Sequence, residues 1–291
     1  MKFNSKTAEV YIPNGLPLEQ ALARTTHLCV AAHQDDIEIM AAQPILACFH
    51  QADKAFTGVV VTDGRGSPRD GLYKDYTDEA MRLVRFGEQR KAADVGEYAA
   101  QVLLDYPSKM VKDPTRNELV EDLITLLRAT KPKIVYTHNL ADKHDTHVAV
   151  SLRLIQALRH LEPAERPAQV VGCEIWRSLD WMVDSEKFVM DVSEHQNLQA
   201  ALLGVFDSQI AGGKRYDAAA LSRRLANATF FESHAVDKSN GLIFGMDLTP
   251  LIQDPSLDVS SYILKYIDHF SQDVTSRIGR LSASANSSAE R

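Results

Sequence analysis

Two short clusters of histidine and aspartate are the features of this sequence that could carry chemistry. The first contains His33, Asp35 and Asp36, and the second contains His144 and His147, which are one helical turn apart. Neutral imidazoles and carboxylates bind Zn²⁺, and a catalytic zinc site typically has three such protein ligands and one open position. A similar set can bind Fe²⁺, so the residue types leave the identity of the metal open.

The elements that must position these clusters alternate between strands and helices. Each strand is apolar throughout, which is typical of a parallel sheet covered by helices on both faces. The predicted strands are 27–32, 56–62, 101–104, 134–137, 170–175 and 188–192. The predicted helices with stated ranges are 38–49, 77–96, 193–206 and 260–280, and Thr77 is the expected N-cap of the second. A further helix is expected behind a capping box at Thr115 and Glu118, and another is marked by apolar residues over 148–158.

Both clusters follow predicted strands of this sheet. Ligands of doubly wound sheets bind at the carboxyl ends of the strands, so the two clusters are expected on the same rim. Taken alone, Asp35 or Asp36 could cap the helix that begins near Ile37, and His144 and His147 could be surface residues. A cap explains one aspartate but not two beside a histidine. We therefore favour a divalent cation held between the clusters.

A nucleotide-binding function is excluded at this rim. The dinucleotide motif GxGxxG should follow the first strand, where the chain instead reads HQDDIE at 33–38. Gly64-Arg65-Gly66 follows the second strand, but Arg69 occupies the position of the third glycine. The motifs GxxxxGK[ST], GxSxG and HExxH do not occur in the sequence.

Composition indicates a folded protein and argues against some classes of partner. The 291 residues are 45% hydrophobic, which is enough for one large α/β domain, and the net charge of −7 argues against a nucleic-acid partner. We expect no membrane partner and no signal peptide. Cys29, Cys48 and Cys173 are interpreted as buried residues of a reducing compartment, so a cytoplasmic location is expected. The expected organisation is an irregular N-terminal extension over 1–25, a single domain over 26–280 and a disordered tail over 281–291.

The two clusters resemble the signatures of the PIG-L/LmbE-like N-acetylglucosaminyl deacetylases, which include deacetylases of mycothiol, bacillithiol and GPI-anchor biosynthesis. AHQDDIE at 32–38 matches the family signature AHPDDxE except for Gln34. HDTHVA at 144–149 is similar to HxDH followed by an apolar pair, with Asp145 and Thr146 differing in their order. Weaker similarities extend the resemblance over about 26–232: Arg85-x-x-Glu88, LDYP at 104–107 before Ser108, DVS at 191–193 and Ser208-Gln209.

The resemblance implies a Rossmann-like three-layer α/β sandwich, with C-terminal helical additions, that binds one zinc per chain. His33, Asp36 and His147 would be the metal ligands. Asp35 would be the general base that activates a zinc-bound water, and His144 the electrophilic partner and proton donor. The reaction would remove acetate from an N-acetylated amino sugar or its conjugate and leave a free amine. Fe²⁺ or another divalent metal is an alternative to zinc.

Two arginines are candidate substrate contacts. Arg85 matches the family helix that carries a substrate-contacting arginine, although it could instead pair with Glu88 on the helix surface. Arg65 lies in the loop after the second strand and would bind a phosphate or carboxylate of the substrate if it points inward; otherwise it is a solvated loop charge. His138 and Asp142 could orient the metal ligands. Trp176 and Trp181 could form a wall for a sugar ring or belong to the core.

Two other functions remain open at this point. The same metal machinery could serve an amidase that cleaves a larger N-acyl conjugate. Alternatively, the chain could be a Rossmann-like binding protein with a structural or vestigial metal site, although such a site has no use for an unligated carboxylate at Asp35. A homo-oligomer is compatible with the sequence.

Overall fold

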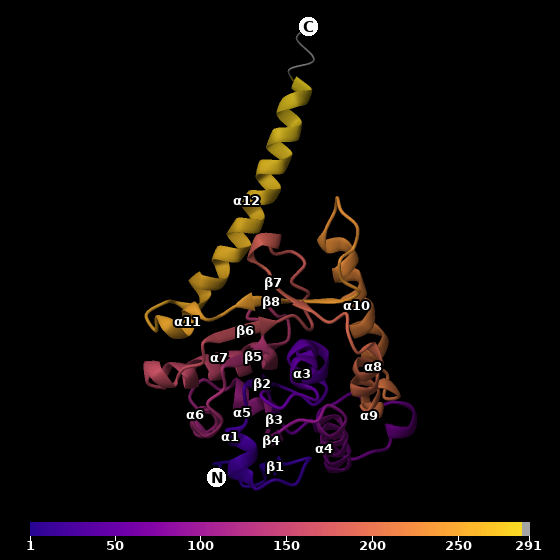
Figure 1. Ribbon diagram of the computed structural model, residues 1–291, viewed down its shortest axis with the longest axis vertical. Coiled ribbons are helices and arrows are strands. Elements are labelled where there is room, and N and C mark those ends of the chain that lie inside the picture. Colours follow the sequence, from indigo (N-terminus) through magenta and orange to yellow (C-terminus); the bar gives the residue numbers. More distant parts are fainter. Residues whose placement is uncertain (287–291) are drawn as a thin grey trace.

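A central eight-stranded sheet organises the chain (Figure 1), and the computed structural model describes residues 1–286. The strand order is β1-β4-β3-β2-β5-β6-β8-β7, in which the five strands from β4 to β6 run parallel and the flanking strands pair antiparallel. This confirms the predicted mostly parallel α/β sheet. The strands are β1 (Glu9–Tyr11), β2 (His27–Ala31), β3 (Phe56–Thr62), β4 (Ala100–Tyr106), β5 (Ile134–His138), β6 (Gln169–Cys173), β7 (Phe188–Asp191) and β8 (Leu242–Asp247).

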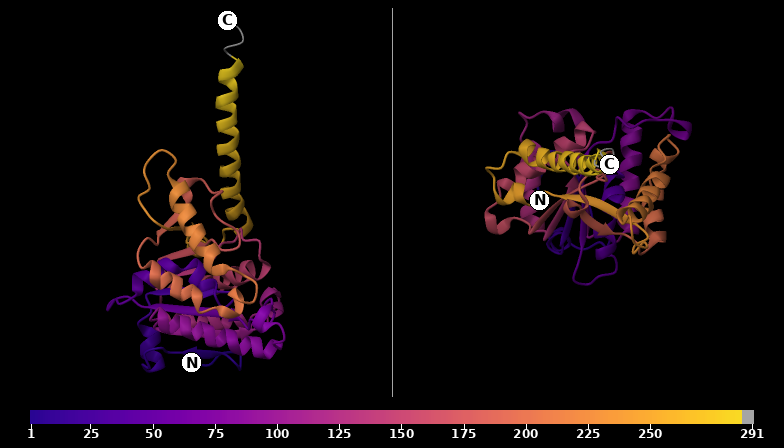
Figure 2. Two further views of the ribbon diagram at one scale, coloured as in Figure 1. Left: turned by 90° about the vertical axis from the view of Figure 1, so that its right-hand side faces the viewer. Right: turned by 90° about the horizontal axis from the view of Figure 1, so that it is seen from above.

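Helices cover both faces of this sheet and extend the chain at its C-terminus (Figures 1 and 2). Short 3₁₀ turns occur at Gly71–Tyr73, Pro163–Glu165 and Asp184–Glu186. The α-helices are α1 (Leu18–Ala23), α2 (Asp36–Met40), α3 (Ala42–Cys48), α4 (Asp78–Val95), α5 (Ser108–Lys112), α6 (Glu118–Thr130), α7 (Asp145–Arg159), α8 (Gln196–Gly204), α9 (Asp207–Ile210), α10 (Tyr216–Phe231), α11 (Pro250–Gln253) and α12 (Val259–Asn286).

Alternate residues of β2 belong to two separate apolar cores, which gives the molecule three layers. Leu28 and Val30 pack in one core together with buried residues of α6 and α7. Cys29 and Ala31 pack in the other, with buried residues of α2, α3 and α8. Because side chains of a strand point alternately to opposite faces, a strand covered on both sides must be apolar throughout. This is why the continuous apolar runs predicted the central strands correctly.

The strand order places a topological switch point between β2 and β5. From β2 the chain moves outward through β3 and β4, and it then returns to form β5 on the other side of β2. In open α/β sheets, the crevice at the carboxyl ends of two such strands is where ligands bind. The loop after β2 carries His33 and Asp35, and the segment after β5 carries His144 and His147. The sheet therefore brings the two predicted clusters to one crevice.

Several predicted boundaries were wrong. Residues 1–25 are not irregular, because β1 pairs with the edge of the sheet at β4 and α1 follows it. The predicted helix 38–49 is two helices that meet at Ala41. Thr115 does not cap a helix, because its hydroxyl donates to Asp113 and α6 begins only at Glu118. Strand β8 was not predicted. Thr77 does cap α4, as expected.

The last helix, α12, projects away from the sheet like a stalk (Figure 2). It continues to Asn286, so residues 281–286 of the predicted disordered tail are helical, whereas 287–291 lie outside the described residues. Within residues 1–286, no helix combines the length and hydropathy that crossing a lipid bilayer requires.

Candidate metal centre and active site

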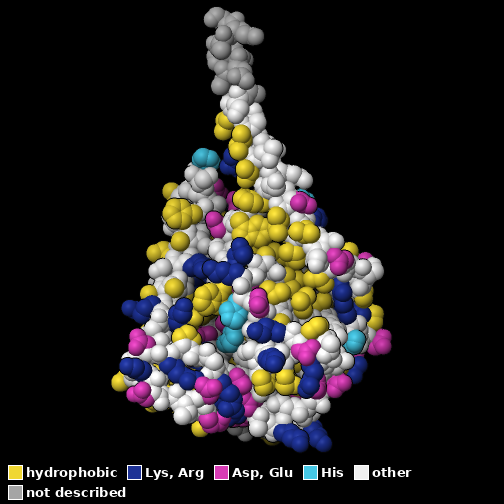
Figure 3. Space-filling model, turned by 180° about the vertical axis from the view of Figure 1, so that it is seen from behind, with side chains coloured by type: hydrophobic (Ala, Val, Ile, Leu, Met, Phe, Trp, Pro, Cys, Tyr) yellow, Lys and Arg dark blue, Asp and Glu magenta, His cyan; other side chains and the backbone are white. Residues whose placement is uncertain are grey.

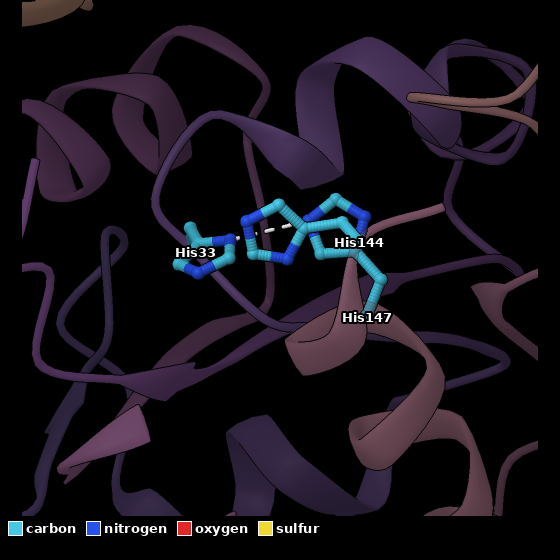
Figure 4. A group of neighbouring side chains, drawn as sticks. All are labelled: His33, His144 and His147. Atoms are coloured by element: carbon cyan, nitrogen blue, oxygen red, sulfur yellow. Dashed lines mark hydrogen bonds between the residues drawn. The ribbon is translucent and has the colours of Figure 1, made fainter. Parts of the chain in front are cut away.

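Three ligand atoms from the two clusters converge at the switch point. His33 lies in the turn after β2, Asp36 is the first residue of α2, and His147 lies in the first turn of α7. The His33 Nδ1 atom is 3.2 Å from both Asp36 Oδ2 and His147 Nε2, and the latter two atoms are 3.4 Å apart. Figure 4 shows His33 and His147 approaching from their separate segments, with His144 beside them.

This triangle of atoms fits a metal ion. Ligands at the 2.0–2.1 Å distances typical of zinc, in tetrahedral geometry, are about 3.3–3.4 Å apart. Two imidazole nitrogens and a carboxylate oxygen therefore have both the chemistry and the spacing of a three-ligand site. His144 and His138 also lie within reach, since the sets His33–His144–His147 and Asp36–His138–His147 each have ligand atoms within 4.8 Å of one another.

His138 serves the site in another way. It is fully buried at the end of β5, and its Nε2 atom accepts a hydrogen bond of 2.8 Å from the backbone N–H of Ala32. That nitrogen is therefore already engaged and the ring proton must sit on Nδ1. The His138 ring stacks on His147 with 4.0 Å between centroids. It thus fixes the orientation of the ligand ring and ties β5 to the end of β2.

Asp142 supports His147 from the opposite side. Its Oδ2 atom is 3.6 Å from His147 Nδ1, and its two oxygens accept hydrogen bonds from the backbone N–H groups of His144 and Trp176. Burial would raise the pKa of Asp142, but His147 and the hydrogen bonds lower it below the ordinary value. A carboxylate held in this way directs the other nitrogen of His147 toward the metal position.

The charges at the site favour metal binding. Burial lowers the pKa of His33 despite the attraction of Asp36, so its ring is neutral near pH 7. Burial acts to raise the pKa of Asp36, but His147 and His33 outweigh it and hold that pKa well below its usual range. Neutral imidazoles and an ionised carboxylate are the protonation states that a metal ion requires.

Asp35 faces the same space without joining the triangle. It precedes α2 with φ of 93°, a strained backbone conformation for a residue other than glycine. Its side chain is buried, and Oδ2 lies 3.5 Å from the guanidinium of Arg85. Burial raises the pKa of Asp35 well above that of a free aspartate, and Arg85 opposes this rise. A carboxyl whose pKa has moved toward neutrality is suited to accepting and returning a proton.

His33 and Asp36 line a cavity of about 400 Å³, and His147 lies fully buried behind them. His144, Asp35 and Arg85 also line it, together with Trp176 and Tyr216. The His144 ring lies edge-on to His33 at 5.1 Å, and its buried Nδ1 atom has no hydrogen-bond partner among the described residues. Burial and the neighbouring His147 lower the pKa of His144. Its position allows it to hydrogen-bond to a molecule held in the cavity.

Arg85 is buried, and its position is fixed by backbone and side chains of the adjoining loops. It donates to the Gln34 carbonyl oxygen and to the Ser67 hydroxyl. Gly64 makes this packing possible: it has φ of 69°, and a Cβ atom there would collide with the Gln34 side chain and crowd Arg85. Arg85 therefore belongs to the cavity wall and is not a solvated helix residue.

Arg65 occupies a different environment. It forms ion pairs with Glu79 and Asp63, and its side chain is 38% exposed. The residues that line the cavity include its neighbours Gly64 and Gly66, but Arg65 itself is turned toward α4. This arrangement gives no support to the predicted substrate contact at Arg65.

Residues from the second half of the chain complete the cavity. Trp176 follows β6, and the ammonium groups of Lys143 and Lys214 lie 6.0 and 5.2 Å from the centroid of its ring. Lys214 and Tyr216 were not predicted, because they lie far from both clusters in an unpatterned segment where α10 begins. Trp176 was weighed only as one of two possible aromatic walls, and a lone tryptophan after a strand gave no stronger signal.

Glu88 fixes the wall that carries Gln209. Its carboxylate accepts hydrogen bonds from the backbone N–H and the hydroxyl of Ser208, at 2.7 and 2.6 Å. All three residues are buried, and Gln209 lines the cavity. The structure thus joins Arg85-x-x-Glu88 to Ser208-Gln209, two weak landmarks that lie 120 residues apart in the sequence.

A parallel sheet with a histidine and aspartate centre at its switch point defines a Rossmann-like α/β protein with a candidate metal site. The family comparison is specific: residues 28–158 match the PIG-L family model, which is described as GlcNAc-PI de-N-acetylase. The resemblance read from the two clusters is thereby confirmed over this range, which is a little under half of the chain. No curated protein gave a significant match.

Solved structures share the fold beyond this range. N,N'-diacetylchitobiose deacetylase from Pyrococcus horikoshii superposes with a TM-score of 0.62 at 15% identity, over 81% of this chain and 88% of that one. A conserved protein from Thermus thermophilus gives 0.59 at 17% identity, over 81% and 100% of the two chains. The 4-carboxy-2-hydroxymuconate hydratase of Pseudomonas putida gives 0.59 at 17%, over 78% and 97%. At these identities the matches show the fold, and a deacetylase and a hydratase share it, so the reaction must be argued from the site.

Proposed function

We propose that this protein is a metal-dependent N-deacetylase of an N-acetylated amino sugar or its conjugate. The observation that carries the proposal is the convergence of His33 Nδ1, Asp36 Oδ2 and His147 Nε2 within 3.4 Å of one another. This group lies at a cavity that is lined by His33 and Asp36 and also by Asp35 and His144. A metal held by these three residues would act as a Lewis acid toward an amide carbonyl and would lower the pKa of water.

Asp35 is the proposed general base. A water molecule that attacks the acetamide carbonyl must lose a proton, and the Asp35 carboxyl, beside the ligands but outside the triangle, can accept it. The nearby Arg85 guanidinium opposes the rise in the pKa of Asp35 that burial causes, and so favours the ionised form that a base requires. Returned to the amide nitrogen, the same proton makes the amine a leaving group, so the products are acetate and a free amine.

His144 is the proposed partner on the other side of the scissile bond. Its ring stands beside His33 and His147, and its Nδ1 atom is without a hydrogen-bond partner among the described residues. An imidazole there can donate a hydrogen bond to the carbonyl oxygen as negative charge develops on it, or a proton to the departing amine. Asp142 binds the backbone N–H of His144 and so helps to hold this residue in place.

The cavity wall suggests how a sugar ring is held. Trp176 offers an aromatic face, and the ammonium groups of Lys143 and Lys214 stand over it. No carboxylate lies within ion-pair distance of either ammonium group among residues 1–286, and Arg85 lines the same cavity as Trp176. This arrangement suits a substrate with an anionic group, such as a phosphate or carboxylate, next to the ring. Binding of substrate by Arg65 stays a prediction without structural support.

A second hollow of about 260 Å³ adjoins the first and shares Asp35, Asp36, Trp176 and Tyr216 with it. The combined space favours a substrate larger than a single sugar, either a glycoconjugate or a longer N-acyl conjugate. An amidase that acts on a longer N-acyl conjugate is therefore the alternative function. The identity of the acyl group that is released distinguishes this amidase from a deacetylase.

The test is an activity screen of the metal-loaded protein across N-acetylated sugars, their phosphates and their glycosides, with free amine and acetate both measured. We expect equal release of amine and acetate, faster for the anionic substrates, and a smaller preference for them after Lys214→Ala. Release of a longer acyl group in preference to acetate would establish the amidase. If protein with one metal per chain hydrolyses none of these amides, the proposal is wrong and a binding function remains.

A further inference from the structure

Helix α12 begins against the body of the protein and ends in solvent. Ile263 and Tyr266 are buried in the core that contains α6 and α7. The Phe270 ring still contacts Trp181, with centroids 6.3 Å apart, and His269 Nδ1 lies at a hydrogen-bond distance of 2.6 Å from the Glu186 carboxylate. From residue 271 to 282 every position is exposed, and Figures 1 and 2 show this outer half standing clear of the sheet.

The outer half of α12 continues the apolar face of the packed half. A helix turns by 100° per residue, so five large apolar residues, Val274 among them, lie within about 40° of the direction of Val274 around the helix axis. The buried Ile263 lies on the same face. Figure 3 shows apolar side chains extending from the body along this helix. The five residues and their exposed fractions are Ile267 43%, Phe270 40%, Val274 38%, Ile278 60% and Leu281 64%.

A helical segment of this kind needs a partner. A helix that stands clear of the body for about twelve residues is marginally stable in water, and an apolar stripe on it adds a cost. The stripe is also ordered in its spacing: its members are separated by three, four, four and three residues. This spacing is the same when it is read in either direction from Val274. A surface with that symmetry is complementary to itself under a two-fold rotation.

We propose that α12 binds α12 of a second copy of this chain as an antiparallel helix pair, with the two-fold axis at Val274. In this arrangement the two Val274 side chains meet at the axis. Phe270 lies level with Ile278 of the partner subunit, and Ile267 with Leu281 of the partner subunit. The last turn of the stripe then packs in the corner between α12 and the body of the other copy, where Trp181 already contacts Phe270.

The charges beside the stripe match this pairing. Asp273 and Arg277 lie on one flank and form an ion pair of 3.1 Å within the helix. The antiparallel arrangement brings Asp273 of one copy within two residues' rise, about 3 Å along the axis, of Arg277 of the partner subunit. In a parallel pair, this flank would instead face Ser271 and Thr275 of the partner subunit, and both bodies would lie at the same end of the helices.

The first test is the mass of the full-length protein in solution, measured by sedimentation velocity over a range of micromolar concentrations. We expect a dimer for the wild type and for Ser276→Asp, which places a charge on the opposite face of the helix. Val274→Asp should dissociate at least ~10-fold more readily. A wild type that is monomeric throughout, or a Val274→Asp variant as dimeric as Ser276→Asp, overturns the proposal. A monomer that binds anionic lipid vesicles through this stripe would also overturn it.

The second test concerns orientation. The native cysteines are buried, so single cysteines can be introduced as Phe270→Cys and Ile278→Cys. Oxidation of a mixture of the two variants should yield the mixed disulfide, because these positions are level in the antiparallel pair. Ile278→Cys alone should not crosslink, since its two copies would be about 12 Å apart along the axis. Efficient crosslinking of Ile278→Cys with itself would indicate a parallel pair and contradict the proposal. Neither test depends on enzymatic activity.

Discussion

The Asp142 carboxylate stands 3.6 Å behind His147, on the side of the ring that faces away from the candidate metal centre. Because backbone N–H groups of His144 and Trp176 hold this carboxylate in place, it can keep the His147 ring in one orientation. Asp142→Asn retains an acceptor for the backbone but loses the charge. We expect metal affinity to fall roughly 10- to 100-fold, measured by competition with a chromogenic chelator. Unchanged affinity would show that His147 needs no such support.

Asp35→Asn should separate catalysis from metal binding. The substitution keeps the size of the side chain and leaves His33, Asp36 and His147 untouched, so metal content should stay at the wild-type level. The rate of deacetylation should fall by ~10²–10⁴-fold, because the variant has no group that can take the proton from water. Metal content by atomic absorption and kcat for the same preparation check both parts. A fast variant would remove Asp35 from the role of base.

Removal of the metal should affect stability as well as activity. A ligand that binds only the folded state stabilises it by about 2.7 kcal/mol when its free concentration is 100 times Kd. Dialysis against a chelator should therefore lower the melting temperature and abolish hydrolysis, and added Zn²⁺ should restore both. His33→Ala, which lacks one ligand, serves as the control because its melting temperature should respond little to metal. If wild type and His33→Ala respond equally, the metal binds elsewhere.

The Glu88–Ser208 contact should matter for stability more than for chemistry. Glu88→Ala leaves a buried N–H of Ser208 without an acceptor, which costs about 1–3 kcal/mol. Ser208→Ala removes the hydroxyl but leaves that N–H bonded to Glu88, so it should cost less. Urea unfolding of the two variants gives the comparison. Equal losses would mean that the hydroxyl, and not the backbone, dominates this contact.

His27 should contribute to the loss of stability in mild acid. Burial, together with Lys54 and Lys133, lowers the pKa of His27 in the folded protein. The unfolded chain therefore binds a proton more readily, so the stabilisation is complete above about pH 6.5 and declines as the pH falls below it. His27→Gln should show a shallower decline in urea midpoint between about pH 7 and pH 5 than the wild type. Because other histidines also titrate, the difference between the two proteins is the relevant quantity, and identical slopes would contradict the expectation.

The sequence was informative where chemistry and secondary structure are local. His33, Asp35 and Asp36 directly follow one buried strand, and His144 and His147 begin the helix after another. The rim of a parallel sheet is shared by all its strands, so their meeting could be predicted without coordinates. The pairing of β1 with β4 could not, because three half-buried residues at an edge carry no distinct hydrophobic pattern.

The remainder of the site depends on tertiary contacts. Lys214 and Tyr216 reach the cavity from a segment that has no periodicity, and Trp176 gains its neighbours only through folding. The environment of Arg65 was likewise decided by the position of Glu79 on the facing helix. Interactions of this kind arise between segments far apart in the chain, and single-residue identity gives no indication of them.

The residues proposed to act on the amide and three other residues that line the cavity come from different parts of the chain, and this has an evolutionary consequence. Every atom proposed to act on the amide comes from residues 33–147, whereas Trp176, Lys214 and Tyr216 come from the later part of the chain. Substitutions in the later segment alone can therefore alter which substrate is bound, while the residues that act on the amide stay unchanged. New specificities on this scaffold require no reinvention of its chemistry.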